Sequence, residues 1–175
     1  RQMCIRDRKR SDIGAYGSFG LTASTLFMVN SRKQLYQLFV IGFEANLFNL
    51  AAMQFTKNST LRIRPFMYNP DVPIENKLDI DGQKSFFSGH TSTSATNCFL
   101  LARFHADLFP DSKYNKYIWT AAAIIPAWVA MERYWAGKHF PTDVIAGYAV
   151  GAGIGYFLPK LHYKKDKRAI TRHIS

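Results

Sequence analysis

The stretch RYWAGKHFPTD, residues 133–143, leads into the last long apolar segment of the chain and decides how the rest is interpreted. His139 and Asp143 are four residues apart, so wherever the stretch is helical they share a face and the carboxylate can reach the imidazole. Such a pair fixes the tautomer of the ring and raises the basicity of its other nitrogen. Pro141 suits a first helical turn, and Asp143 suits the positive end of a helix dipole. A surface loop entering a helix would explain the same residues, so the upstream sequence has to decide.

Composition argues against a nucleic-acid-binding domain, although the formal charge is +11. Eleven of the 23 basic residues fall in the first ten and the last sixteen positions, and the body between them has twelve basic against ten acidic residues. Those twelve are scattered, and no DNA- or RNA-binding motif accompanies them. At 175 residues the chain is long enough for one domain. The two cysteines, Cys4 and Cys98, show no metal-binding or redox spacing, and Cys98 is expected to be a small buried hydrophobic residue.

Five apolar segments are near the roughly 20 residues that a helix needs to cross a bilayer. They are Ile13 to Asn30, Leu35 to Thr56, Ser88 to Phe109, Tyr117 to Met131 and Pro141 to Leu158. The fold class expected from them is an all-α transmembrane helix bundle. A soluble helical bundle stays open as an alternative, because the mean hydropathy of −0.15 is low and polar residues interrupt the second and third segments.

Two features favour the membrane bundle over the soluble one. Residues 117–131 form a continuous, largely apolar run, and aromatic residues near the segment ends are typical of membrane interfaces. Gly147, Gly151 and Gly155 recur at every fourth position, which lets another helix approach closely. Polar residues inside the spans are then expected to face the interior of the bundle.

Basic flanks predict the orientation of the bundle. The lysines and arginines after the fifth segment place that end in the cytoplasm, and alternation then puts residues 57–87 and 132–140 together on the outer face. An odd number of spans puts the basic N-terminus outside, so a sixth span is expected to precede this sequence. Residues 1–10 begin without Met and match no later element; they are interpreted as non-native or disordered. Residues 11–159 then form one helical domain, and residues 160–175 a basic cytoplasmic tail.

Two further pieces of candidate chemistry fall on the outer face. Lys57, Arg62 and Arg64 are three cations in a short span that can surround an anion, although basic residues beside a membrane often touch lipid headgroups instead. Residues 88–90, Ser-Gly-His, open the third segment. Ser88 suits an N-cap and Gly89 allows close approach, so the first helix amides can form an anion site with His90 beside it. An ordinary helix cap would explain this tripeptide in isolation.

Taken together, the pieces resemble the three-part signature of the type 2 phosphatidic acid phosphatase superfamily, which includes the lipid phosphate phosphatases and the related haloperoxidases. The motifs that carry the resemblance are Lys57 and Arg64-Pro65 with six residues between them, then Ser88-Gly89-His90, then Arg133 with His139 and Asp143. Two positions depart from the family pattern: Phe87 stands where proline is common, and Glu132 stands where serine is common. Glu132 adds a negative charge that would either weaken anion binding or hold Arg133 in place.

The resemblance implies a role for each matched residue. His139, oriented by Asp143, would attack phosphorus and become a phosphohistidine. His90 would protonate the leaving oxygen and then deprotonate the attacking water. Phosphate would be bound by Lys57, Arg64, Arg133, Ser88 and Gly89. The resemblance implies no metal and no cofactor.

The function expected from the sequence is hydrolysis of a phosphomonoester or pyrophosphate of a membrane lipid. The protein is expected to be an integral protein of a bacterial inner membrane, with its site facing the periplasm and no nucleic-acid partner. Two alternatives stay open: a soluble or periplasmic acid phosphatase with the same site, and a non-catalytic membrane protein that binds phospholipids. The identity of the lipid and the oligomeric state do not follow from the sequence.

Overall fold

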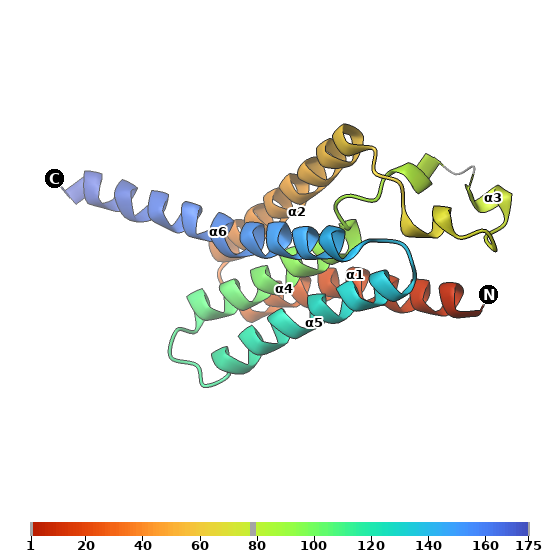
Figure 1. Cartoon of the computed structure of the whole chain (residues 1–175). Coiled ribbons are helices and arrows are strands. Elements are labelled where there is room, and N and C mark those ends of the chain that lie inside the picture. Colours follow the sequence, from red (N-terminus) through yellow and green to blue (C-terminus); the bar gives the residue numbers. More distant parts are fainter. Residues whose placement is uncertain (1, 78–79, 175) are drawn as a thin grey trace.

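The helices of the protein run back and forth along one direction and bring four chain segments to one end. The computed structural model describes residues 2–77 and 80–174, with side chains described for 12–74, 77 and 82–162. The long helices are α1 (Gln2–Ser24), α2 (Arg32–Thr60), α4 (Gly89–Leu108), α5 (Asn115–Trp135) and α6 (Pro141–Ile174). Short helical turns are η1 (Thr25–Met28), η2 (Pro65–Tyr68), α3 (Ile74–Lys77) and η3 (Ile80–Gln83). The end of α2 and the starts of α4 and α6 lie on the right in Figure 1, together with the end of α5.

Helix α4 is the centre of the bundle and packs against α1, α2, α5 and α6. Its central position explains its composition of small and polar residues, because small side chains let neighbouring helices approach closely. Residues 94–98, Ser-Ala-Thr-Asn-Cys, are all buried. Cys98 is therefore the small buried residue that the sequence predicts. Apolar packing between α2 and α4 adds Leu38, Ile41 and Ala45 against Leu100 and Phe104.

The glycine spacing in α6 is explained by its contact with α4. A Cβ on Gly147 would lie 2.7 Å from the carbonyl oxygen of Ser88, and one on Gly151 or Gly155 would overlap the backbone of Ser92 or Thr96. The predicted close helix approach is therefore confirmed, and its partner is the small-residue face of α4. A larger residue at Gly151 would force the two helices apart.

Polar residues between the helices pair with one another in the bundle interior. Asn46 of α2 and Asn97 of α4 exchange side-chain hydrogen bonds of 3.2 and 3.0 Å. Thr22 of α1 donates to the carbonyl of Asn97 over 2.8 Å. Interhelical hydrogen bonds in membrane bundles contribute roughly 0.6 kcal/mol each, so their main effect here is to set how the helices are aligned. Glu44 is an exception, since it pairs with His162 on the exposed surface.

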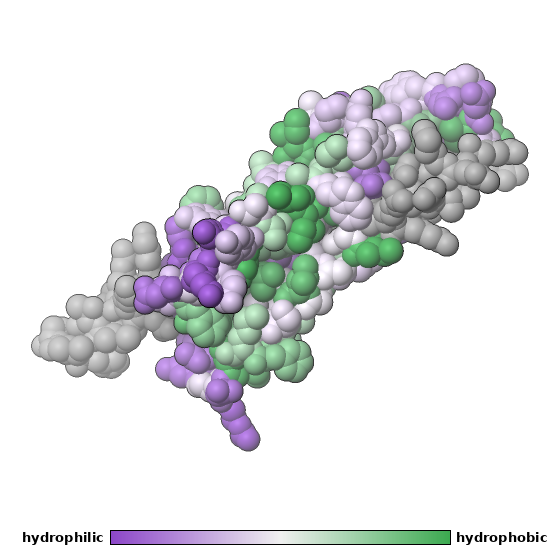
Figure 2. Space-filling model, turned by 90° about the horizontal axis from the view of Figure 1, so that it is seen from below, coloured by the Kyte–Doolittle hydropathy of each residue, from purple (hydrophilic) through white to green (hydrophobic). Residues whose placement is uncertain are grey.

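The outward faces of the helices expose large apolar side chains. Phe39, Phe43, Phe48 and Phe55 of α2 are all more than half exposed. Figure 2 shows hydrophobic residues gathered along the middle of the visible face and hydrophilic residues toward its ends. Helices α2 and α6 are long and apolar enough to cross a membrane. The expected total of five spans stays a prediction.

The two ends of the chain continue the neighbouring helices. The backbone of residues 2–10 belongs to α1, and that of residues 160–174 belongs to α6. The side chains of residues 1–11 and 163–175 lie outside the described part of the chain. The domain boundaries expected at residues 10 and 160 stay predictions.

Candidate active site

A tight reversal between α5 and α6 turns His139 back into the bundle. Helix α5 ends at Trp135, and Gly137 follows with a φ of +64°, a left-handed conformation that glycine adopts without strain. The Gly137 N–H donates to the carbonyl of Tyr134 over 2.9 Å, and the Lys138 N–H donates to that of Arg133 over 3.2 Å. These two bonds are those of a Schellman motif, which ends a helix and redirects the chain.

The start of α6 is held by a reciprocal contact between its first turn and the preceding residue. Pro141 is the first helical residue, as the sequence predicts. The backbone N–H of Phe140 donates to Oδ2 of Asp143 over 2.9 Å, and the backbone N–H of Asp143 donates to the carbonyl of Phe140 over 3.0 Å. A carboxylate three residues after the N-cap satisfies one of the amides that the helix leaves unpaired.

His139 is buried, with 2% of its side chain exposed, and its ring is held by a backbone carbonyl. Its Nδ1 lies 2.8 Å from the carbonyl oxygen of Ser85. Because a carbonyl can only accept a hydrogen bond, Nδ1 carries the proton and Nε2 carries the lone pair. The carboxylate of Asp143 lies 3.8 Å from Nδ1, which differs from the directly hydrogen-bonded pair that the four-residue spacing suggests. Tertiary contact with the Ser85 loop replaces the expected local bond.

Burial lowers the pKa of His139 from 6.5 to about 4. The positive charges of Arg133 and Arg64 act in the same direction, and the nearby Asp143 carboxylate opposes them. The ring is therefore neutral at physiological pH. A neutral imidazole with a lone pair on Nε2 is the form in which histidine can act as a nucleophile or as a base.

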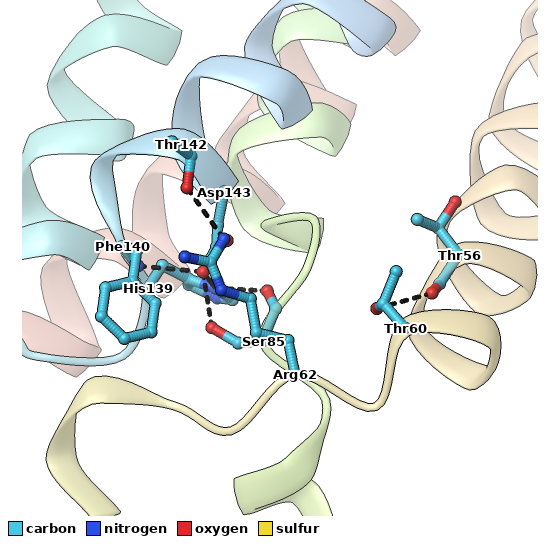
Figure 3. A network of polar contacts seen from close by, with 8 residues as sticks. All are labelled: Thr56, Thr60, Arg62, Ser85, His139, Phe140, Thr142 and Asp143. Carbon is cyan, nitrogen blue, oxygen red and sulfur yellow. Dashed lines mark hydrogen bonds and ion pairs between the residues drawn. The ribbon is translucent and has the colours of Figure 1, made fainter. Parts of the chain in front are cut away.

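Asp143 joins three segments of the chain (Figure 3). Its Oδ2 accepts from the Ser85 hydroxyl over 2.5 Å, and its Oδ1 accepts from the Arg62 guanidinium over 2.6 Å. Its backbone carbonyl accepts from the Ser88 N–H over 3.0 Å. The carboxylate therefore orients His139 indirectly, by fixing the Ser85 loop whose carbonyl holds the ring.

The second candidate histidine, His90, lies in the first turn of α4 and is 29% exposed. Its Nε2 lies 2.7 Å from Oδ1 of Asp12 in α1. Ser88 occupies the N-cap position of α4, as predicted, but its hydroxyl does not cap the helix. The Ser88 hydroxyl instead accepts from the hydroxyl of Thr91 over 2.9 Å.

The predicted close approach at Gly89 takes place against α2. A Cβ on Gly89 would overlap the sulfur of Met53 and lie 3.7 Å from Nζ of Lys57. The ammonium group of Lys57 is therefore beside the first turn of α4, where the helix amides point toward an incoming anion.

Two of the predicted phosphate-binding cations are buried at this end of the bundle. Arg64 and Arg133 are each only 5% exposed. Arg64 is anchored by its backbone N–H, which donates to the carbonyl of Gly82 over 2.9 Å. Two guanidinium groups at one end of the bundle add positive charge there, and guanidinium geometry suits the oxygens of a phosphate.

Arg62 lies differently from what the sequence suggests, whereas the two effects expected of Glu132 stay predictions. Arg62 does not join the anion-surrounding group; its guanidinium pairs with Asp143 and lies 4.4 Å from the centre of the Phe140 ring. Glu132 is buried in α5, with 4% exposed. Of the residues that hydrogen-bond to the two histidines, sequence reasoning missed Asp12 and Ser85, because both act through contacts between distant segments.

Among the residues that the structure describes, no group of three His, Cys, Asp or Glu side chains is placed to hold a metal ion. The expectation that the chemistry needs no metal stays an expectation.

Comparison with known proteins agrees with this arrangement of groups. The profile of the PAP2 superfamily matches residues 33–167, which is most of the chain. A lipid A 4'-phosphatase of Porphyromonas gingivalis is 38% identical over 147 residues, covering 80% of this chain and 58% of that protein. A phosphatidylglycerophosphatase B of Bacillus subtilis is 35% identical over 85 residues, covering 48% of this chain and 41% of that protein. The chain belongs to the PAP2 superfamily.

A solved structure shows the same fold. The crystal structure of a transmembrane PAP2-type phosphatidylglycerolphosphate phosphatase from Bacillus subtilis aligns with a TM-score of 0.59 and 22% identity, covering 91% of this chain and 85% of that one. The expected all-α helical bundle is therefore confirmed as a fold. The chain spans about half the length of the curated relatives described above.

Proposed function

We propose that the protein hydrolyses a phosphomonoester or pyrophosphate of a membrane lipid through a phosphohistidine intermediate. The observation that carries the proposal is the hydrogen bond from Nδ1 of His139 to the Ser85 carbonyl, which leaves a lone pair on Nε2. Arg64 follows the end of α2 and Arg133 lies in the last turn of α5, and both of these helix ends are at the end of the bundle where α4 starts. A nucleophile surrounded by anion-binding groups is what transfer of a phosphoryl group needs.

In the first step, Nε2 of His139 forms a bond to phosphorus while the bond from phosphorus to the leaving oxygen breaks. His90 gives a proton to that oxygen, so the lipid alcohol or lipid phosphate leaves protonated. In the second step, a water oxygen attacks phosphorus, the N–P bond breaks, and the water proton returns to His90. Lys57, Arg64, Arg133 and the Gly89 amide bind the phosphoryl oxygens throughout, while the Ser88 amide is already bonded to the carbonyl of Asp143.

A lipid substrate is favoured over a soluble one by the surface of the helices. The phenylalanines of α2 are largely exposed, which is unfavourable in water and ordinary in contact with acyl chains. A site at the end of such a bundle meets the headgroups of lipids. The relatives named above are phosphatases of lipid A and of phosphatidylglycerophosphate, which supports a lipid phosphate as the substrate class.

The site is proposed to face the outside of a bacterial inner membrane. The argument is the positive-inside rule applied to the basic residues in the last part of α6, after Leu158. A phosphatase reporter fused after Ser175 should be inactive in whole cells, and a cytoplasmic fluorescent reporter should be active. The reverse pattern would show that the site faces the cytoplasm.

The activity is tested with the purified protein in detergent and a panel of phosphatidic acid, phosphatidylglycerophosphate, a polyprenyl pyrophosphate and a phosphorylated lipid A. We expect phosphate release from at least one lipid, inhibition by vanadate, and loss of release in His139→Ala. Asp111→Asn, an exposed change in the α4–α5 connection, is the matched control and should behave as wild type. Undiminished phosphate release by His139→Ala would overturn the proposed mechanism.

A further inference from the structure

Helix α1 provides two side chains that contact His90. Oδ1 of Asp12 lies 2.7 Å from Nε2 of His90, and the ring of Tyr16 meets the imidazole edge-on with 6.4 Å between ring centres. Asp12 and Tyr16 are four residues apart, so they lie on one face of α1. Helix α1 precedes the part of the chain that the superfamily profile matches, residues 33–167.

The position of α1 is set by contacts on both sides. On α5, a Cβ at Gly14 would lie 2.5 Å from Cγ2 of Val129, so the two helices touch at this glycine. On α4, the carbonyl of Asn97 accepts the hydroxyl of Thr22 over 2.8 Å. These contacts fix the height and rotation of α1, and they place Asp12 against His90.

The charges around His90 make a carboxylate at this place chemically useful. Arg133 of α5 and Lys57 of α2 both lie near the ring and repel a protonated imidazole. Asp12 of α1 has the opposite charge, and the same Oδ1 that meets His90 lies 4.0 Å from the guanidinium of Arg133. To donate a proton, the His90 imidazole has to be protonated at the start of the reaction. The two cations destabilise this protonated ring, and the carboxylate of Asp12 stabilises it.

We infer that Asp12 is a positioning residue of the reaction, holding His90 by Nε2 and stabilising its protonated form until the leaving group departs. This inference rests on the proposed phosphatase function. Since an ionised carboxylate can only accept, Nε2 carries a proton, and the transferred proton sits on Nδ1 of the imidazolium. When the leaving oxygen takes that proton, the N–H bond at Nδ1 breaks and an O–H bond forms. The water that hydrolyses the phosphohistidine then returns one proton to Nδ1.

The test compares Asp12→Asn, Asp12→Glu and the control Asp111→Asn in the lipid phosphate assay. In Asp12→Asn we expect kcat to fall about 10-fold with little change in KM, since the residue does not bind the phosphate. The basic limb of the pH–rate profile should move to lower pH by about one unit, because the nearby negative charge is gone. Asp12→Glu should recover most of kcat and the wild-type profile.

Two kinetic results would overturn the inference. A higher activity or lower KM in Asp12→Asn would mean that the carboxylate occupies the phosphate position and competes with substrate. Wild-type kcat and pH profile with a lower Tm would mean that Asp12 only supports the packing of α1. The protonation midpoint of His90, followed by NMR in protein with labelled histidine, is a readout that needs no turnover. A lower midpoint in Asp12→Asn supports the pairing even if no lipid is hydrolysed, and an unchanged midpoint contradicts it.

Discussion

His139 and His90 lie at the same end of the bundle in different surroundings. His139 is 2% exposed and is held by the backbone carbonyl of Ser85. The Ser85 side chain is bonded in turn to Asp143, which also binds Arg62. His90 is 29% exposed and is held by one carboxylate from α1. This difference suits the proposed roles of His139 as nucleophile and His90 as acid and base. A nucleophile benefits from a fixed, neutral ring, whereas an acid and base must gain and lose a proton in every cycle.

The largest effect should come from removing each histidine in turn and changing the leaving group. With a lipid alcohol as leaving group, His90→Ala should lose about 10²- to 10⁴-fold in rate, because the leaving oxygen is no longer protonated. With a nitrophenyl phosphate, which leaves without a proton, His90→Ala should recover a burst of nitrophenol from the first step, although hydrolysis of the phosphohistidine still lacks its base. His139→Ala should stay inactive with both substrates. Equal recovery of both variants would remove the distinction between the two histidines.

The support of His139 by Asp143 is tested with Asp143→Asn. A lost charge-assisted hydrogen bond is worth about 1.5 to 3 kcal/mol, which corresponds to roughly 10- to 100-fold in rate. We expect a loss of that size in kcat, together with a lower Tm, since the carboxylate joins three segments. Wild-type kcat in Asp143→Asn would show that the Ser85 carbonyl holds the ring without this support.

The burial of His139 predicts how stability depends on pH. Its pKa is about 4 in the folded protein and 6.5 as a free side chain, so between these values the unfolded chain binds more protons. Stability should therefore fall as pH is lowered from 6.5 to 4, by roughly 3 kcal/mol in total from this group. Thermal unfolding in detergent at pH 7.5 and pH 4.5 measures the change. The Tm difference should be smaller in His139→Gln, and an equal difference would contradict the assignment.

The smallest effect is expected from Arg62→Gln. Its guanidinium binds the buried carboxylate of Asp143, but 37% of the Arg62 side chain is exposed, so water screens the pair. Exposed ion pairs contribute about 1 kcal/mol or less, and kcat should fall about threefold. Steady-state kinetics beside Asp143→Asn give the comparison. A loss as large as that of Asp143→Asn would mean that Arg62 contacts the phosphate directly.

Several features could be read from residue types and spacing alone. The helical class, the glycine face of the last helix and the start of that helix at Pro141 follow from patterns that local chemistry decides. The grouping of Lys57, Arg64, His90, Arg133 and His139 followed from a family resemblance and from charge topology. These residues lie at or beside helix ends that the fold brings to one end of the bundle.

The sequence by itself predicted which residues would carry the chemistry, and it determined that they sit at helix ends, because capping and turn formation are local. Tertiary structure alone decided what holds each histidine. The four-residue spacing suggests that Asp143 binds His139 directly, but the closest acceptor is a carbonyl 54 residues away, in the Ser85 loop. The partner of His90 comes from α1, 78 residues away. Contacts between segments so far apart depend on how the helices pack, which no local pattern encodes.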